Sequence, residues 1–451
     1  MKHTYSYILL ALAACFAACH KEETVDISQP KIAAGQPITS DTLSGSVKGT
    51  LLTGKTYYFR NDITVNTGDT LLMQAGTKLI AIGDGSAAAS PQITVNGTFV
   101  SLGSQDNQNF ITVPDDKRKN DNVGKGYWGG IQGGPTSGDI IIKWTHLEFA
   151  GGPAGSGADP AVYSAGDPRY TLAYTNPQGN CILEDSWIFG STDDGMRILT
   201  GKINIMRNTF EACGKAGGES VNLKGGTVGN VAYNISIGAA TNSFKASNSG
   251  GTTIQTNVNV YNNTIINGGM RQIKSGRGGS INYEKGAQGK VYNNIIVNSR
   301  FGLRITTDAD TSHIDYDNQF YYGNAAYFIA QFNAADGVAK TKSNDIRSTA
   351  PKTNNPLFAS YDVDMFDYSA VKPPLDITAM PFSIITAVNY NFGLLPGSPA
   401  SKKGFTGFQP LKVVPEGGLY GATIDGPGVD MGAYQSGGAG NLHYASSLSF
   451  K

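Results

Sequence analysis

The 451-residue sequence lacks a charge bias, because 35 basic residues balance 35 acidic ones. A general nucleic-acid binder needs a basic surface that displaces counterions, so we predict no nucleic-acid partner. Cysteine and histidine are also scarce, with four and five residues. Beyond residue 19 only Cys181 and Cys213 remain, at different places in the repeat described below. The sequence therefore predicts neither a disulfide nor a zinc site.

After its first 20 residues the chain also lacks long apolar runs, and nowhere does it sustain a 3.6-residue periodicity. These absences argue against membrane-spanning helices and helical repeats. Glycine (58 residues) and asparagine (34 residues) are in excess, and 16 of the asparagines lie between residues 201 and 300. Both residues have low helix propensity, whereas an apolar content of 40% is enough for a core. The composition predicts many short strands and tight turns.

The first 19 residues have the pattern of an export signal. An apolar stretch, 8–18, follows a basic start and at about 11 residues is too short to span a bilayer. Small residues lead into Cys15 and again into Cys19, an ending that resembles the lipobox of bacterial lipoproteins, in which the cysteine is lipidated. We predict lipidation at Cys19, with Cys15 as the alternative, because Cys19 leaves the longer apolar region.

The charged run directly after Cys19 resembles the surface-export signal of Bacteroidetes lipoproteins. This resemblance implies a lipid anchor in the outer membrane and a surface-exposed protein. Residues 20–45 lack periodicity and are predicted to be a flexible tether. An ordinary secretory signal with incidental cysteines is the alternative.

A core phrase recurs through the middle of the chain at irregular intervals. It is a polar residue followed by strand-forming residues, as in Asn263-Thr264-Ile265-Ile266. Its markers are Ser186, Asn208, Asn234, Asn263, Asn294 and Asn318, at steps of 22, 26, 29, 31 and 24 residues. Such periods are typical of solenoids, and without leucine or helical patterns they favour a right-handed parallel β-helix. We expect the asparagines to stack as amide ladders and to occupy left-handed bends, not to be catalytic.

Phrases at both ends of the chain resemble known β-helix proteins. Three segments near the start resemble the opening coils of exported Bacteroidetes β-helix proteins: Gly76-Thr77-Lys78-Leu79, Ile93-Thr94-Val95-Asn96-Gly97 and Trp128-Gly129-Gly130-Ile131. Two segments near the end resemble the closing segment of the superfamily that includes pectate-lyase-like and chondroitinase-B-like proteins. They are Leu395-Pro396-Gly397-Ser398-Pro399-Ala400 and Asp430-Met431-Gly432-Ala433-Tyr434. The resemblance implies an all-β fold.

We therefore predict a single elongated domain, a right-handed parallel β-helix over residues 46–435, that is a monomer. Three insertions interrupt its rhythm, at 114–126, 151–179 and 333–389. On a solenoid, insertions often gather on one face and shape a binding cleft, although they can equally be surface decoration. Residues 436–451 are expected to be a loose tail.

Glycine, an apolar residue and arginine begin a strand three times. Strand alternation would set Arg197, Arg271 and Arg304 in one outward column. Nearby in the sequence lie Lys274, Arg277, Lys285 and Arg300, with Glu284 as a counter-charge. Because guanidinium groups suit carboxylates and sulfates, this strip predicts binding of an acidic polysaccharide. The alternative is surface pairing of these cations with Asp193, Asp194, Asp308 and Asp310.

Two functional hypotheses follow from this strip. The first is a surface protein that binds carbohydrate without catalysis. The second is a polysaccharide lyase that acts by β-elimination on a uronic-acid polymer, with Lys274 as the base and Arg271 and Arg304 as carboxylate and leaving-group partners. A hydrolase is ranked lower, because Asp193-Asp194-Gly195 only approaches the polygalacturonase pattern and no Gly-His pair occurs.

A bound cofactor is not predicted. The resemblance to chondroitinase-B-like proteins implies calcium held by Asn and Glu, but the Glu-x-Glu run expected shortly before Lys274 is absent. Calcium on aspartates is a weaker alternative, and the candidate carboxylates are Asp308, Asp310, Asp315 and Asp317. No metal ligands are therefore assigned.

Overall fold

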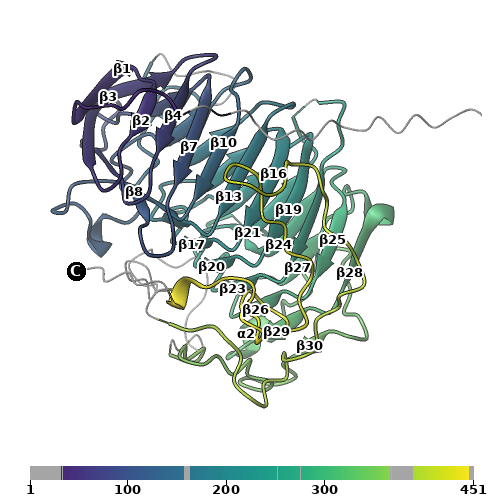
Figure 1. The fold of residues 1–451 in the computed structure, drawn as a ribbon. Helices are drawn as coiled ribbons and strands as arrows, with labels where there is room; N and C mark the ends of the chain where they lie inside the picture. Colours follow the sequence, from purple (N-terminus) through teal and green to yellow (C-terminus); the bar gives the residue numbers. More distant parts are fainter. Residues whose placement is uncertain are drawn as a thin grey trace, which may run out of the picture.

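Three parallel sheets run along the molecule (Figure 1). The computed structural model describes residues 32, 34–156, 163–250, 252–274, 276–365, 367 and 390–445. The first sheet comprises β2 (Gly49–Leu51), β4 (Thr70–Met73), β7 (Thr98–Leu102), β10 (Ile140–Lys143), β13 (Asn180–Glu184), β16 (Gly201–Met206), β19 (Thr227–Ala232), β22 (Asn257–Tyr261), β25 (Gly289–Tyr292) and β28 (Ile314–Asp317).

The second and third sheets share their first two strands, β1 (Thr42–Ser46) and the long strand β3 (Thr56–Val65), which pair with each other. The second sheet continues with β5 (Lys78–Ala81), β8 (Asn109–Thr112), β11 (Thr145–Glu148), β14 (Trp187–Phe189), β17 (Thr209–Glu211), β20 (Ile235–Ile237), β23 (Thr264–Ile266), β26 (Ile295–Val297), β29 (Phe320–Tyr322) and β30 (Ile346–Arg347). The third continues with β6 (Ile93–Val95), β9 (Ile131–Gly133), β12 (Leu172–Tyr174), β15 (Met196–Ile198), β18 (Val221–Leu223), β21 (Asn242–Ser247), β24 (Gly279–Glu284) and β27 (Leu303–Ile305).

The order of the strands makes the fold a parallel β-helix, which confirms the predicted fold class. The chain passes through β13, β14 and β15, one strand in each sheet, and then repeats the circuit one coil further on with β16, β17 and β18. Among the described residues, helical structure is limited to η1 (Asn120–Asn122), η2 (Thr311–His313), α2 (Ala326–Ile329) and η4 (His443–Ala445). Within the part of the chain that the structure describes, no helix combines the length and apolar character needed to span a bilayer.

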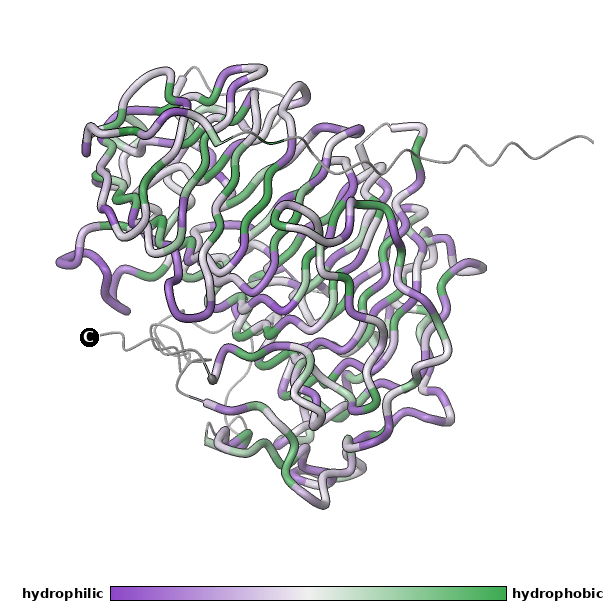
Figure 2. The backbone as a smooth tube through the Cα atoms, viewed as in Figure 1, coloured by the Kyte–Doolittle hydropathy of each residue, from purple (hydrophilic) through white to green (hydrophobic). Residues whose placement is uncertain are grey.

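Alternation along each strand builds the core. In the third sheet Met196, Val221, Phe244, Ile281 and Leu303 stand in register on successive coils, and each is at most 1% exposed. In the coloured part of the backbone, hydrophobic segments alternate with hydrophilic ones from coil to coil (Figure 2). Each coil buries its own inward residues only by stacking on its neighbours, as expected for a solenoid.

The predicted asparagine ladder is present between the first and second sheets. The side-chain amide of Asn234 donates to Asn263 Oδ1 (3.0 Å), and that of Asn263 donates to Asn294 Oδ1 (2.9 Å). The side-chain oxygen of each ladder asparagine also accepts a hydrogen bond from the backbone N–H of the preceding marker. For example, the backbone N–H of Asn208 donates to Asn234 Oδ1 (2.9 Å). The ladder asparagines are fully buried, so they satisfy backbone groups that water cannot reach.

Two details of the ladder differ from the prediction. The marker Asn318 is displaced by one residue, because Asn294 Nδ2 donates to Gln319 Oε1 (3.1 Å) instead. The left-handed backbone belongs to the residue before each marker and not to the marker. Those residues are Asp185, Arg207, Tyr233, Asn262, Asn293 and Asn318, with φ between 51° and 61°. The residue before each marker therefore makes the turn, and the marker itself makes the ladder hydrogen bonds.

The C-terminal segment covers the outer sides of the first two sheets. Lys143 Nζ donates to Gly421 O (2.6 Å) and Leu411 N donates to Asn230 Oδ1 (2.9 Å), so this segment crosses the first sheet, in yellow in Figure 1. Met431 and Ala433 pack on the second sheet in an apolar cluster. The C-terminal segment therefore covers the first two sheets and leaves the outer side of the third sheet uncovered by these contacts.

The described part of the expected loose tail, 436–445, packs against the body. His443 is fully buried, accepts or donates a hydrogen bond at Thr209 Oγ1 (2.7 Å) and stacks on Trp187 with ring centroids 3.7 Å apart. Cys181 and Cys213 are buried free thiols, as expected. Cys15, Cys19, most of the tether and residues 157–162 and 368–389 of two insertions lie outside the described residues.

Candidate functional site

One outward column of polar side chains follows the third sheet. Register places Arg197 of β15 beside Asn222 of β18, then Lys245 of β21, Asn282 of β24 and Arg304 of β27. Arg197 and Arg304 therefore share the outward column that strand alternation predicted. The apolar residues on either side of each point inward, which fixes the column on the solvent side.

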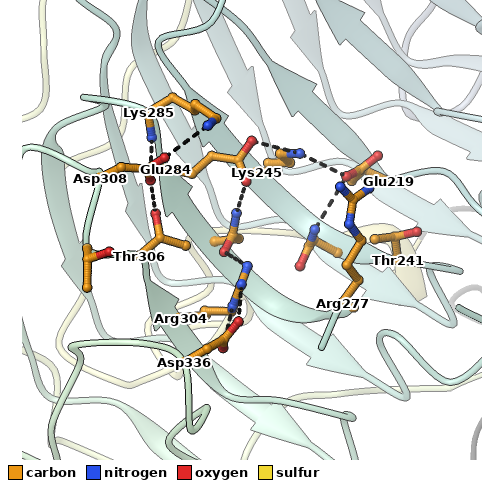
Figure 3. Close-up of a pocket in the computed structure, with 14 residues that line it drawn as sticks. Glu219, Thr241, Lys245, Arg277, Glu284, Lys285, Arg304, Thr306, Asp308 and Asp336 are labelled. Atoms are coloured by element: carbon orange, nitrogen blue, oxygen red, sulfur yellow. Dashed lines mark hydrogen bonds and ion pairs between the residues drawn. The ribbon is translucent and has the colours of Figure 1, made fainter. Parts of the chain in front are cut away.

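The column forms the floor of a groove made of two adjoining cavities. One cavity, of about 590 Å³, holds Asp193, Arg197 and Lys274 at its edges. The other, of about 400 Å³, extends to Arg304 and Asp336 (Figure 3). Both cavities are lined by Glu219, Thr241, Lys245, Arg277 and Glu284. We call the two together the third-sheet groove.

Lys245 links the two cavities through carboxylates on either side. Its Nζ lies 3.0 Å from Glu284 Oε1 and 3.7 Å from Glu219 Oε1. Asn282 donates to Glu284 Oε2 (3.1 Å) and in turn accepts from Arg304 (3.0 Å). Figure 3 shows Lys245, Glu284 and Arg304 close together over adjacent strands. The floor of the groove is a connected network of hydrogen bonds and ion pairs.

Asp194 anchors the end of the network nearest β15. It is fully buried and accepts from Arg197 Nε (2.7 Å), from the backbone N–H of Glu219 (2.7 Å) and from Asn222 Nδ2 (2.9 Å). Although burial opposes ionisation, the Arg197 charge and these donors hold the pKa of Asp194 below its usual value. This pairing of Arg197 was the predicted alternative to glycan binding.

The pKa values of two other carboxyl groups at the same end are shifted in the opposite direction, upward. Burial, followed by the charge of Asp194, raises the pKa of Glu219 to about 8. Burial and the same neighbouring charge raise the pKa of Asp193 to about 7. Three carboxyl groups on two adjacent coils thus have different protonation states near neutral pH.

Arg271 does not belong to the groove, so its predicted place in the outward column is wrong. Its side chain is 1% exposed and donates to the backbone oxygens of Gly238 (2.7 Å), Cys213 (3.1 Å), Lys215 (3.1 Å) and Gly214. The alignment failed because this coil is lengthened before β24, and the outward residue in register is Asn282.

The other predicted residues divide between the groove and its surroundings. Lys274 and Arg277 are exposed at the rim, and neither has a carboxylate within ion-pair distance among the described residues. Glu284 and Lys285 line the cavity at the Arg304 end. Arg300 lies outside and donates to Gln272 O (2.6 Å), so it holds the loop that carries Lys274.

Each aspartate considered for calcium has a partner of its own. Asp308 pairs with Lys285 (3.1 Å), Asp310 with His313 (2.9 Å) and Asp315 with Lys290 (2.9 Å). Asp317 accepts from Asn344 (2.9 Å). Across the described ranges, no group of three or more ligand-type side chains gathers as a metal site.

The sequence analysis missed Glu219, Asn222, Lys245, Asn282 and Asp336. A tripeptide of apolar, polar and apolar residues marks each strand of the column, as in Val221-Asn222-Leu223 and Phe244-Lys245-Ala246. Aligning those tripeptides would have identified three of the five. Glu219 precedes its strand and Asp336 comes from an insertion, so no local pattern marks either of them.

Comparisons were made with family models, curated proteins and solved structures, and none of them matches this chain. Its own residues therefore define its class: a parallel β-helix with a polar groove along the third sheet.

Proposed function

We propose that the third-sheet groove binds an acidic polysaccharide. The observation that supports this is the row of Arg197, Lys245 and Arg304 along the floor, with Lys274 and Arg277 at the rim. Four coil steps separate Arg197 from Arg304, which at a strand spacing of about 4.8 Å is roughly 19 Å. An extended polymer bearing repeated carboxylates or sulfates matches such a row.

The carboxyl groups of the groove complement this role. Glu219 and Glu284 flank Lys245, and Asp336 accepts from Arg304 Nε (3.0 Å). They hold the floor cations in place and offer acceptors to sugar hydroxyl groups. The rim cations are not neutralised in this way, so we assign them the direct contacts with the acidic groups of the glycan.

Removing both rim cations tests this proposal. We expect the double variant K274A/R277A to bind polygalacturonate with a Kd raised about 10-fold or more, since each lost charge-assisted contact is worth roughly 1 kcal/mol at an exposed site. Calorimetry at two salt concentrations should also show a weaker salt dependence. The matched control K55A/R60A removes one exposed lysine and one exposed arginine outside the groove. Equal loss of affinity in both double variants would contradict the proposal.

The lyase hypothesis receives less support from the geometry. Its base Lys274 borders one cavity, Arg304 borders the other, and Arg271 is buried beneath neighbouring loops. A lyase needs these three groups around one sugar unit. We retain non-catalytic binding as the proposed function and do not advance this set of residues.

We also propose that the chain is an exported lipoprotein of the pectate-lyase-like and chondroitinase-B-like superfamily, held in the outer membrane through Cys19. The apolar leader and the small residues before that cysteine support it. Labelled palmitate fed to expressing cells should enter the wild type and Cys15→Ala but not Cys19→Ala. Label retained in Cys19→Ala would contradict the assignment.

A further inference from the structure

Asp193 and Glu219 lie at one end of the third-sheet groove and both line the same cavity. Stacking of the coils places Gly218, the residue before Glu219, against Asp193. A Cβ built at Gly218 would be 2.9 Å from Asp193 Oδ1, and the residue has a φ of 109°, which favours glycine. The backbone of one coil therefore approaches the carboxylate of the previous coil at the position next to Glu219.

We propose that Asp193 and Glu219 are an acid–base pair that hydrolyses a glycosidic bond of the polysaccharide in this groove. The inference rests on the proposed function, because the glycan must first bind. It adds an activity that the binding hypothesis does not contain, and it uses Glu219, which no sequence motif marked.

The surroundings of Glu219 suit a general acid. It is 7% exposed, and burial, followed by the charge of the ionised Asp194, favours its protonated form by raising its pKa. Asn222 Nδ2 donates to Glu219 Oε2 (3.2 Å) and Asn242 Nδ2 donates to Glu219 Oε1 (3.3 Å), which fixes the orientation of the carboxyl group. Asp194 itself is fully buried and makes no contact with the cavity, so it is a positioning residue.

A second feature of the cavity points to a ligand that donates hydrogen bonds. Asn222 lines the cavity and is 1% exposed, and its Oδ1 has no hydrogen-bond partner in the described part of the chain. Its Nδ2 is committed to Asp194 and Glu219, so rotation of the amide would bring Oδ1 against two carboxyl groups. A sugar hydroxyl is the kind of donor that this oxygen requires.

The proposed step balances with water as the second reactant. The water oxygen forms a bond to the anomeric carbon, and the bond from that carbon to the bridging oxygen breaks. Asp193, as carboxylate, takes one proton from the water, and Glu219 gives its proton to the departing oxygen. The products are two shorter saccharides, one with a new reducing end, and no redox change occurs.

The test follows reducing ends and unsaturated ends in parallel. The purified full chain is incubated with polygalacturonate, alginate and chondroitin sulfate, and binding of each glycan is measured separately. We expect new reducing ends without ultraviolet-absorbing products on a glycan that binds. Glu219→Gln and Asp193→Asn should each lower this rate by about 10²–10⁴-fold while glycan binding persists. Asp106→Asn, at an exposed turn outside the groove, is the matched control.

A pH profile separates catalysis from a structural role. Asp193 must be ionised and Glu219 protonated, so kcat/KM should peak between pH 7 and 8. Asp194→Asn removes the charge that raises both pKa values, so the whole profile should move to lower pH. Loss of rate in Asp194→Asn with no movement of the profile would overturn its positioning role.

The outcomes distinguish this inference from the proposed function. Glycan binding with no new reducing ends would overturn the hydrolase and leave the binding proposal standing. Unsaturated ends would overturn it in favour of elimination. No binding to any of the three glycans would overturn the proposed function, and the inference with it.

Discussion

Asn263→Ala should lower the free energy of unfolding by about 3–5 kcal/mol, because it breaks the asparagine ladder at its centre. The side chain of Asn263 accepts from the backbone N–H (2.9 Å) and the amide (3.0 Å) of Asn234. It also donates to Val231 O (3.0 Å) and to Asn294 Oδ1 (2.9 Å). Alanine leaves these buried groups unpaired, at about 1–3 kcal/mol for each group that water cannot reach.

Urea unfolding followed by circular dichroism measures the effect. The matched control Asn61→Ala removes an exposed asparagine from β3 and should change the free energy of unfolding by less than about 0.5 kcal/mol. Asn263→Asp tests the chemistry more narrowly, since it keeps the acceptor and loses the donor. Wild-type stability in Asn263→Ala would contradict the account of the ladder as the main hydrogen-bonding support of these turns.

Arg271→Met should lower the free energy of unfolding by about 2–4 kcal/mol. The guanidinium of Arg271 ties together backbone oxygens of two neighbouring coils, at Gly238 and at 213–215. Methionine fills much of the volume but supplies no donors, so these carbonyl groups lose their partner. The loss of local stability should be largest at residues 213–218, the segment that leads into Glu219 at the groove.

Hydrogen exchange and urea unfolding together test this role. Amides at 213–218 should exchange faster in Arg271→Met, whereas Arg277→Met, an exposed arginine on the same loop, should alter neither exchange nor stability. If Arg271 instead contacted substrate, as the sequence suggested, Arg271→Met would weaken glycan binding with wild-type stability. That pattern would contradict the structural assignment.

Most of the fold could be predicted from the local sequence pattern that each coil repeats. Each coil is a short circuit of strand, turn and strand, and the marker residues recur because every coil must satisfy the same backbone groups at the same bend. That repetition allowed the parallel β-helix and the ladder from Asn208 to Asn294 to be predicted. The misplaced marker, Asn318 for Gln319, arose because a glutamine performs the amide's role in that coil.

The site was less accessible from the sequence, because it depends on which residues fall in register. Arg197 and Arg304 were placed correctly, since each follows an inward apolar residue on its own strand. Arg271 was misplaced because a lengthened loop moves the strand start to β24, and loop length has no periodic signature. Lys245 occupies the position in the column between Asn222 and Asn282 and was overlooked.

The sequence by itself determined the class of fold, the amide ladder and the outward direction of two arginines, because these follow from alternation and turn chemistry within a coil. Only the tertiary structure decided that Asp194 and Glu219 meet, that Asp336 reaches Arg304 and that the C-terminal segment covers two of the three sheets. Those contacts join residues from different coils and insertions. Their distances depend on how the coils stack, which no local pattern encodes.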